Sequence, residues 1–257
     1  MSSLVRKLIR SPHILEVFGS YGLGTLLQLY FVIFIELASF STAIAYVGIG
    51  LIIYTFLEYW FHRIILHNFL EKAHNNHHSI PRNLKIIATP IIPVHIYDLF
   101  FIHAFHIFFP KEVVFGVNVG ISIGQSIMDT VHILFHTQYR PWYLESARSY
   151  HLHHHFVDGQ SAHGLTTSFW DLIFGTFPKN WCYNKKYPWI VYFQLPFPVI
   201  GFALISLFCS DETKRPSPEL TPRSEHTRIR PHGSANYLNV FLTTLSAVCV
   251  VCTPYLL

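Results

Sequence analysis

Ten of the eighteen histidines in this chain fall into four tight clusters, and this pattern constrains the fold more than any other feature. Side chains three and four residues apart lie on one face of a helix, and imidazole is the commonest metal-ligating side chain. We therefore expect the three rings of each histidine triad to converge on one point. The clusters are His62 and His67; His74, His77 and His78; His132 and His136; and His151, His154 and His155. Ten ligands exceed what one tetrahedral or octahedral ion needs, so the sequence predicts two metal ions.

Two spacings do not fit one regular helix face. His153 follows His151 by two residues, about 200° around a helix, and is expected to point away from the shared face. His62 and His67 are five residues apart, about 140° around a regular helix. Either the helix loosens between these two rings, or the rings serve different metals.

The composition predicts an integral membrane protein. Apolar residues make up 51% of the chain and charged residues only 12%, against roughly 25% charged residues in a soluble domain. Four apolar runs are each about long enough to cross the roughly 30 Å hydrocarbon core at 1.5 Å per residue. They are Leu23–Phe40, Ala43–Phe61, Ile86–Phe109 and Val113–Leu134. We therefore expect an all-α integral membrane protein with two transmembrane helical hairpins that carry a cytosolic, histidine-rich helical metal domain.

The predicted hairpins place both halves of the histidine set on one side of the membrane. Arg6, Lys7 and Arg10 favour a cytosolic N-terminus by the positive-inside rule. The first hairpin then returns the chain to the cytosol where His62–His78 begins, and the second delivers His132–His155 to the same side. The predicted topology and the predicted metal chemistry therefore agree.

Composition divides the chain into five segments. We expect a cytosolic N-terminal segment at 1–22, the membrane domain with the four clusters at 23–189, an apolar membrane-associated run at 190–209, a disordered linker at 210–235 and a C-terminal apolar segment at 236–257. The linker is rich in serine, proline and mixed charge, which is typical of disorder. The basic residues are dispersed and lack the pattern of a nucleic-acid surface, so no nucleic-acid partner is expected.

Two carboxylates are expected to orient metal-bound imidazoles. Metal-ligating histidines commonly donate their second ring N–H to a carboxylate. Glu58 precedes His62 by four residues and Asp129 precedes His132 by three, so each shares a helix face with its histidine. The alternative is that both carboxylates simply reach the membrane interface. Arg63 is a candidate ion-pair partner for these acids.

The segment after the last cluster completes a recognisable pattern. The stretch from Trp170 to Thr176 predicts a short amphipathic segment that ends at a glycine cap and packs over the histidines. The four clusters, their order and this tail resemble the fatty acid hydroxylase superfamily, integral-membrane oxygenases that also include sterol desaturases. Within it, residues 58–63 (EYWFHR) and 166–176 (TTSFWDLIFGT) most resemble the fatty acid 2-hydroxylases that act on sphingolipid acyl chains.

This resemblance implies a metal pair, taken as di-iron, that uses dioxygen and electrons to oxidise an unactivated C–H bond of a membrane lipid. The implied ligands are His62, His67, His74, His77, His78, His132, His136, His151, His154 and His155. Neutral imidazoles also suit zinc, so purified protein can carry zinc instead. No fused cytochrome b5-like domain is evident, so a separate cytochrome b5-type donor and its reductase are expected. The expected location is the endoplasmic reticulum membrane of a eukaryote, or otherwise the cytoplasmic membrane.

Three functions remain open from the sequence. The first is 2-hydroxylation of sphingolipid acyl chains, and the second applies the same chemistry to a sterol or carotenoid, as hydroxylation or desaturation. The third is a metal transporter or haem-binding membrane protein, which the position of the clusters at helix ends disfavours. His163 stands where the 2-hydroxylases have an aromatic residue, and we interpret it as either an eleventh ligand or a substrate-facing donor.

Overall fold

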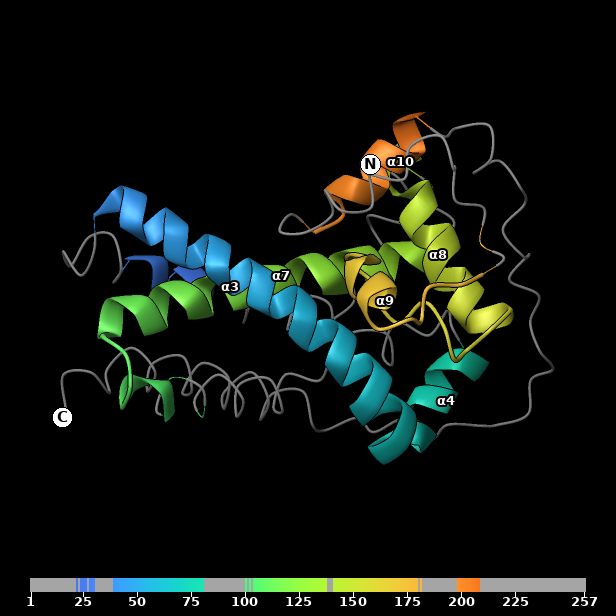
Figure 1. Ribbon diagram of the computed structural model, residues 1–257, viewed down its shortest axis with the longest axis horizontal. Coiled ribbons are helices and arrows are strands. Elements are labelled where there is room, and N and C mark those ends of the chain that lie inside the picture. The colour runs from blue at the N-terminus through green and yellow to red at the C-terminus, as the bar shows by residue number, and fades with distance from the viewer. Residues whose placement is uncertain are drawn as a thin grey trace, which may run out of the picture. The chain divides into compact units, whose positions relative to one another are not determined.

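The computed structural model describes residues 39–80, 104–137, 141–179 and 198–208, together with positions 22, 24–26, 28–30, 100, 102 and 181. These residues form helices, turns and loops, and no strand occurs among them (Figure 1). The helical part of the predicted fold class is therefore confirmed for the described part of the chain. The predictions for 1–21, 190–197 and 210–257 lie outside the described residues.

One helix has the properties of a membrane span. α3 (Phe40–Trp60) coincides with the second predicted apolar run and continues into the π-helical segment η1 (Phe61–Phe69). Among the described residues, Phe40–Phe69 is the one helix long and apolar enough to cross a membrane, with a mean hydropathy of 1.9. Ile44 and Ile49 on α3 are about half exposed, as side chains that face lipid are.

The two predicted hairpins are not confirmed. Their other halves, Leu23–Phe40 and Ile86–Phe109, fall largely outside the described residues. The fourth predicted run is helical and corresponds to α7 (Lys111–Phe135).

The chain divides into two units, and in the first one α3 and α7 meet at a glycine. A Cβ atom added to Gly50 would lie 2.0 Å from the carbonyl oxygen of Val117 and 2.9 Å from the Cα atom of Gly120. The absence of a side chain at Gly50 therefore permits this close approach of the two helix backbones.

The second unit contains all four histidine clusters. It comprises the end of α3, η1, α4 (Glu71–Ser79), the end of α7, η2 (Trp142–Leu144), α8 (Glu145–Phe156), α9 (Phe169–Ile173) and α10 (Ile200–Phe208). Its apolar core joins Phe135 of α7 and Tyr150 of α8 to Phe202 and Ile205 of α10. Within the predicted apolar run at 190–209, the described part forms α10, which begins at Ile200, two residues after Pro198. This apolar core holds the end of α7 against α8, the helices that carry His132, His151, His154 and His155.

Candidate metal centre

A π-helical turn brings His62 and His67 to the same site. In η1 the backbone N–H of Leu70 donates to the carbonyl oxygen of Ile65 over 2.8 Å, a bond between residues five apart. Residues five apart face one way in a π-helix, whereas they diverge by about 140° in an α-helix. The ring centroids of His62 and His67 lie 5.3 Å apart. Of the two alternatives drawn from the sequence, the loosened helix is therefore the correct one.

The ten clustered histidines form two groups of five rings. In each group, one ring nitrogen per residue lies within 4.8 Å of the other four. The first histidine group is His62, His67, His74, His78 and His154, and the second histidine group is His77, His132, His136, His151 and His155. Each group combines rings from both halves of the sequence. His153 and His163 belong to neither group.

The prediction that each triad converges on one point is wrong. In α4, His74 and His78 enter the first group, whereas His77 enters the second. α8 repeats this arrangement, with its i and i+4 histidines in the second group and its i+3 histidine in the first. Neighbouring residues of an α-helix point about 100° apart, so the i+3 and i+4 rings diverge. Each triad therefore bridges the two groups.

Hydrogen bonds determine which nitrogen of two rings faces the centre of the first group. Nδ1 of His62 lies 2.5 Å from the carbonyl oxygen of His163, and Nδ1 of His154 lies 2.7 Å from that of Ser161. A carbonyl only accepts, so both Nδ1 atoms carry the proton and both Nε2 atoms carry a lone pair. The Nε2 atom of His62 lies 3.2 Å from Nε2 of His74.

Hydrogen bonds between the rings cannot satisfy all the Nε2 atoms of the first group. Nε2 of His74 also lies 3.1 Å from Nε2 of His67 and 2.9 Å from Nε2 of His78. A neutral imidazole places at most one proton on that atom. Lone pairs therefore face one another unless a cation lies between them. On this ground the donor set of the first group fits a metal ion.

In the second group the Nε2 atoms also face one another at short distances, but the outer Nδ1 atoms have different surroundings from those in the first group. Nε2 of His132 lies 3.0 Å from Nε2 of His77, and Nε2 of His136 lies 2.9 Å from Nε2 of His151. Four Nδ1 atoms of this group are buried without a hydrogen-bond partner among the described residues, those of His77, His136, His151 and His155. These four rings therefore lack the carbonyl bonds that orient two rings of the first group.

Burial keeps the rings neutral. Burial and the neighbouring imidazoles lower the pKa of His74 to about 2 and the pKa of His78 to about 4. Burial likewise holds the pKa of His151 and the pKa of His154 well below the ordinary range. Metal binding needs a deprotonated imidazole nitrogen, and these rings offer one at neutral pH.

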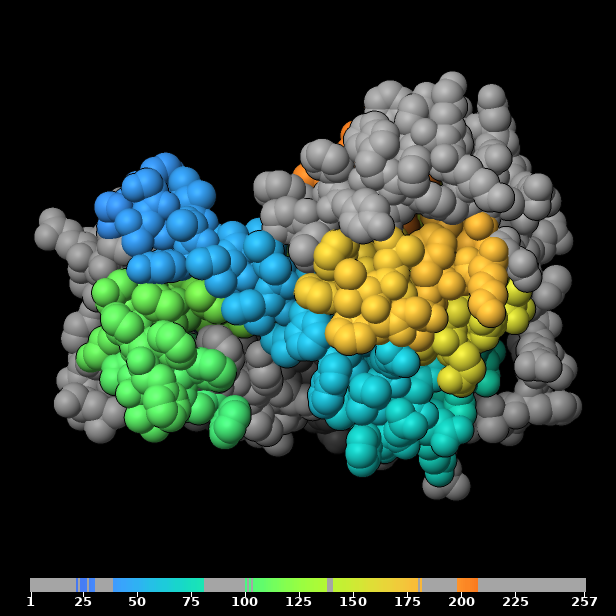
Figure 2. All heavy atoms as spheres, in the orientation of Figure 1, coloured from blue at the N-terminus to red at the C-terminus, as the bar shows by residue number. Residues whose placement is uncertain are grey.

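The two carbonyls that orient the first group belong to one loop, residues 157–168, which Asp171 of α9 holds in place. Asp171 is fully buried. Its Oδ1 accepts from the backbone N–H of His163 (2.9 Å) and from the hydroxyl of Thr176 (2.7 Å), and its Oδ2 accepts from the N–H of Gly164 (2.9 Å). Burial raises the pKa of Asp171 to about 6, although these hydrogen bonds oppose the shift. The loop lies against the end of α3 and against η1, where it contacts Glu58 and His62 (Figure 2).

Glu58 acts on the same loop and does not form the expected bond to His62. Its carboxylate accepts from the N–H of Leu165 (2.5 Å), from the N–H of Thr166 (3.2 Å) and from the Thr166 hydroxyl. The outer nitrogen of the His62 ring is bonded to a loop carbonyl instead. Sequence reasoning missed this arrangement because Glu58 and Leu165 are 107 residues apart.

The other predicted residues near the groups have separate surroundings. Asp129 is fully buried on α7, one turn before His132, and its orienting role stays a prediction. Among the described residues Arg63 forms no ion pair with either predicted acid, and its Nη1 donates instead to the Tyr59 hydroxyl over 2.7 Å. The predicted glycine cap is confirmed: α9 ends at Ile173, and Gly175 has a φ of 72°.

Residues 47–176, just over half of the chain, match the fatty acid hydroxylase family. The chain belongs to the fatty acid hydroxylase family. The matched residues of this fatty acid hydroxylase include all ten clustered histidines and the 157–168 loop. The resemblance drawn from the spacing of the histidines is therefore confirmed.

Similar proteins carry the names of lipid hydroxylases. The chain is 31% identical over 150 residues to the ceramide very long chain fatty acid hydroxylase scs7 of Schizosaccharomyces pombe, covering 53% of this chain and 43% of that one. It is 30% identical over 155 residues to the dihydroceramide fatty acyl 2-hydroxylase FAH2 of Arabidopsis thaliana, covering 54% of this chain and 63% of that one. The fatty acid hydroxylase described here therefore spans less than two thirds of the length of either relative.

The fold matches that of a solved hydroxylase domain. Full-length scs7p, a structure in which only the hydroxylase domain is visible, aligns with a TM-score of 0.52 at 22% sequence identity. The alignment covers 63% of this chain and 62% of that chain. At this identity the likeness concerns the fold alone.

Proposed function

We propose that this protein is a membrane-bound oxygenase with two metal ions that hydroxylates carbon 2 of fatty acyl chains in sphingolipids. The observation that carries the proposal is the presence of two five-histidine groups within the fatty acid hydroxylase fold. The names of the relatives, a ceramide fatty acid hydroxylase and a dihydroceramide fatty acyl 2-hydroxylase, support the choice of substrate. In the overall reaction a C–H bond and dioxygen become C–OH and water, with two electrons and two protons from an external donor.

In this proposal each histidine group holds one ion through the lone pairs of neutral imidazoles. Two bound iron ions would supply the activation of dioxygen, and zinc could replace iron in purified protein. The carbonyls of Ser161 and His163 hold the rings of His154 and His62 in the orientation that presents Nε2. Four of the five rings of the second group are buried, so a metal ion held there would be shielded from bulk water.

The proposed surroundings are a membrane and a separate electron donor. The helix Phe40–Phe69 supports membrane placement, in the endoplasmic reticulum of a eukaryote or otherwise in the cytoplasmic membrane. Trp60 and Phe61, where α3 passes into η1, are each 46% exposed, as aromatic side chains at a membrane interface are. A cytochrome b5-type protein and its reductase would supply the electrons.

Reconstitution under isotopically labelled dioxygen tests the proposed function. The iron-loaded protein would be placed in lipid nanodiscs with cytochrome b5, its reductase and N-palmitoyl sphingosine. The expected product carries one labelled oxygen on carbon 2 of the acyl chain, and the His154→Ala variant forms none. Unlabelled acyl chains together with a new double bond in an added sterol would instead assign the protein to sterol chemistry.

A further inference from the structure

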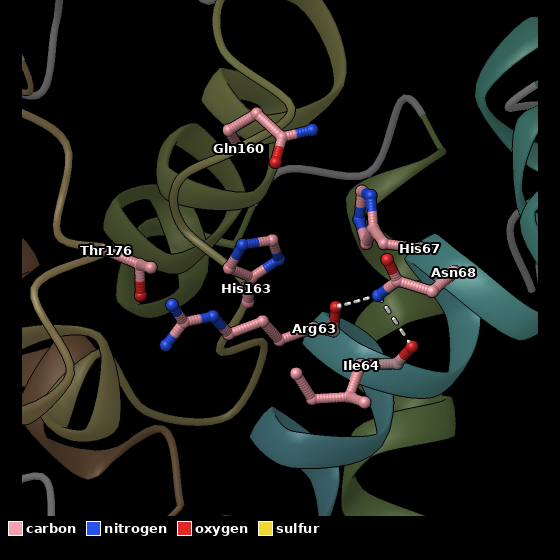
Figure 3. A pocket seen from close by; sticks show the side chains of 7 residues that line it. All are labelled: Arg63, Ile64, His67, Asn68, Gln160, His163 and Thr176. Carbon is pink, nitrogen blue, oxygen red and sulfur yellow. Dashed lines mark hydrogen bonds between the residues drawn. The ribbon is translucent and has the colours of Figure 1, made fainter.

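A polar cavity of about 230 Å³ lies beside the first histidine group (Figure 3). Six of its lining side chains are polar, namely Arg63, His67, Asn68, Gln160, His163 and Thr176, and one, Ile64, is apolar. Pockets that bury a whole drug-sized ligand measure roughly 300–1,000 Å³, so this cavity suits one end of a lipid and not the entire molecule. Its polar walls would bind oxygen atoms better than an alkyl chain, because unpaired buried polar groups are costly.

Arg63 brings a positive charge to the cavity. Its Nη1 donates to the Tyr59 hydroxyl (2.7 Å), and the guanidinium carbon lies 5.9 Å from the centre of the Tyr59 ring. No carboxylate pairs with Arg63 within the part of the chain that the structure describes. A guanidinium has five N–H donors, and only one is engaged by Tyr59. The remaining donors favour a carboxylate or carbonyl oxygen as ligand.

His163 lies between the cavity and the first histidine group. Its ring centroid is 5.0 Å from that of His67, 5.3 Å from that of His154 and 5.5 Å from that of His62. The side chain is 2% exposed, and its Nδ1 has no hydrogen-bond partner among the described residues. In Figure 3 the His163 ring stands among Arg63, Gln160 and His67. A ligand that reaches His163 is therefore one ring away from three proposed metal ligands.

We propose that this cavity binds the oxygen-bearing end of the acyl substrate, with Arg63 and His163 as its hydrogen-bonding anchors. The inference rests on the proposed function and adds how the position of oxidation is chosen. Carbon 2 is bonded directly to the carbonyl carbon, so a carbonyl group held beside the first histidine group brings carbon 2 close to it. The rest of the acyl chain extends out of the cavity. The ligand chemistry is shared by the carboxylate of a free fatty acid and the amide carbonyl of a ceramide.

Binding without turnover tests this assignment. The metal-loaded protein in nanodiscs would be titrated calorimetrically with palmitate and with N-palmitoyl sphingosine, under nitrogen and without reductant. We expect Arg63→Gln to weaken palmitate binding about tenfold or more, the scale of a lost hydrogen bond to a charged group. The Arg63→Lys variant keeps the positive charge but lacks the planar guanidinium, so its affinity for palmitate should lie between those of the wild type and Arg63→Gln. The Lys72→Gln variant, which removes the charge of an exposed α4 side chain outside the cavity, should bind palmitate like the wild type.

His163→Phe keeps an aromatic ring, removes both nitrogens and is expected to weaken binding about threefold or more. A variant is compared only when its metal content equals that of the wild type. If His163→Phe loses metal, the Arg63→Gln variant alone tests the assignment, because Arg63 belongs to neither histidine group. A loss confined to palmitate identifies the carboxylate as the ligand, whereas a loss confined to N-palmitoyl sphingosine identifies the amide. If the Kd values of both ligands for Arg63→Gln and for His163→Phe stay within about twofold of the wild-type values, the assignment is wrong.

The position of hydroxylation gives a second measurement. During turnover, Arg63→Gln should spread the hydroxyl group over carbons beyond carbon 2, since the carbonyl end is no longer anchored. The two proposals fail separately: Arg63-dependent binding without any hydroxylation would refute the proposed function alone. Hydroxylation at carbon 2 with unchanged binding in both variants would refute the cavity assignment alone.

Discussion

Replacing Asp171 by asparagine should weaken metal binding at the first histidine group and leave the second group intact. Asparagine has the same size, but its amide nitrogen cannot accept a hydrogen bond. Oδ2 accepts from the N–H of Gly164 and Oδ1 from the N–H of His163 and the hydroxyl of Thr176. Whichever way the amide turns, at least one fully buried N–H loses its acceptor. The cost is about 1–3 kcal/mol, or roughly 2–12 °C in Tm for a chain of this size.

The effect on metal binding follows from the carbonyl of His163, which orients the ring of His62. Loss of such an outer contact typically weakens metal binding 10–100-fold. The variant would be incubated with increasing concentrations of a chelator, and the metal left on the protein would be measured by elemental analysis. One ion should be lost at a lower chelator concentration than in the wild type, and the other at the same concentration as in the wild type. The control is Asp158→Asn, because Asp158 lies at the exposed start of the same loop and its Oδ1 accepts from the N–H of Gln160, whereas the N–H groups of His163 and Gly164 donate to Asp171. Asp171→Asn protein that holds both ions as tightly as the control, at an unchanged Tm, would refute the reasoning.

The remaining predictions concern metal content, the α8 histidines and the loop. Elemental analysis of folded protein should find two metal ions per chain, and a reproducible value of one would contradict the division into two groups. His154→Ala should abolish hydroxylation and reduce metal content, whereas His153→Ala should keep both, because only His154 belongs to a group; equal losses would disprove this distinction. Gly164→Ala should lower stability by about 1–3 kcal/mol in thermal unfolding, because the added Cβ would lie 2.0 Å from the carbonyl oxygen of Thr167. An unchanged Tm would mean that the loop relaxes freely.

Local spacing predicted which histidines belong to the site. The i, i+4 pairs His74 and His78, and His132 and His136, each share a group because one helical turn returns the side chain to the same direction. The split of the triads could also have been predicted, since i+3 and i+4 positions differ by about 100°. The sequence interpretation placed the i+3 and i+4 histidines on one helix face and therefore missed this divergence.

Other features of the site depend on contacts that no local pattern encodes. Glu58 bonds to Thr166 across 108 residues, and its helix-face relation to His62 suggested a different partner. The carbonyl that accepts from His62 belongs to a residue 101 positions away. A backbone carbonyl is also present at every residue, so the sequence carries no mark of the one that is used. The fold is needed to identify the partners of both His62 and Glu58.

The wide turn of η1 has a consequence for insertions and deletions. A π-helical turn is equivalent to an α-helix that has gained one residue without changing the direction of its flanks. The Asn68 side chain compensates for the gain, since its amide donates to the carbonyl of Ile64 (2.9 Å) and to that of Arg63 (3.4 Å). A chain with His-x3-His in a regular helix can therefore present the same two rings as His62 and His67 do here. Searches for related metal centres that demand a fixed gap between these two ligands would discard such chains.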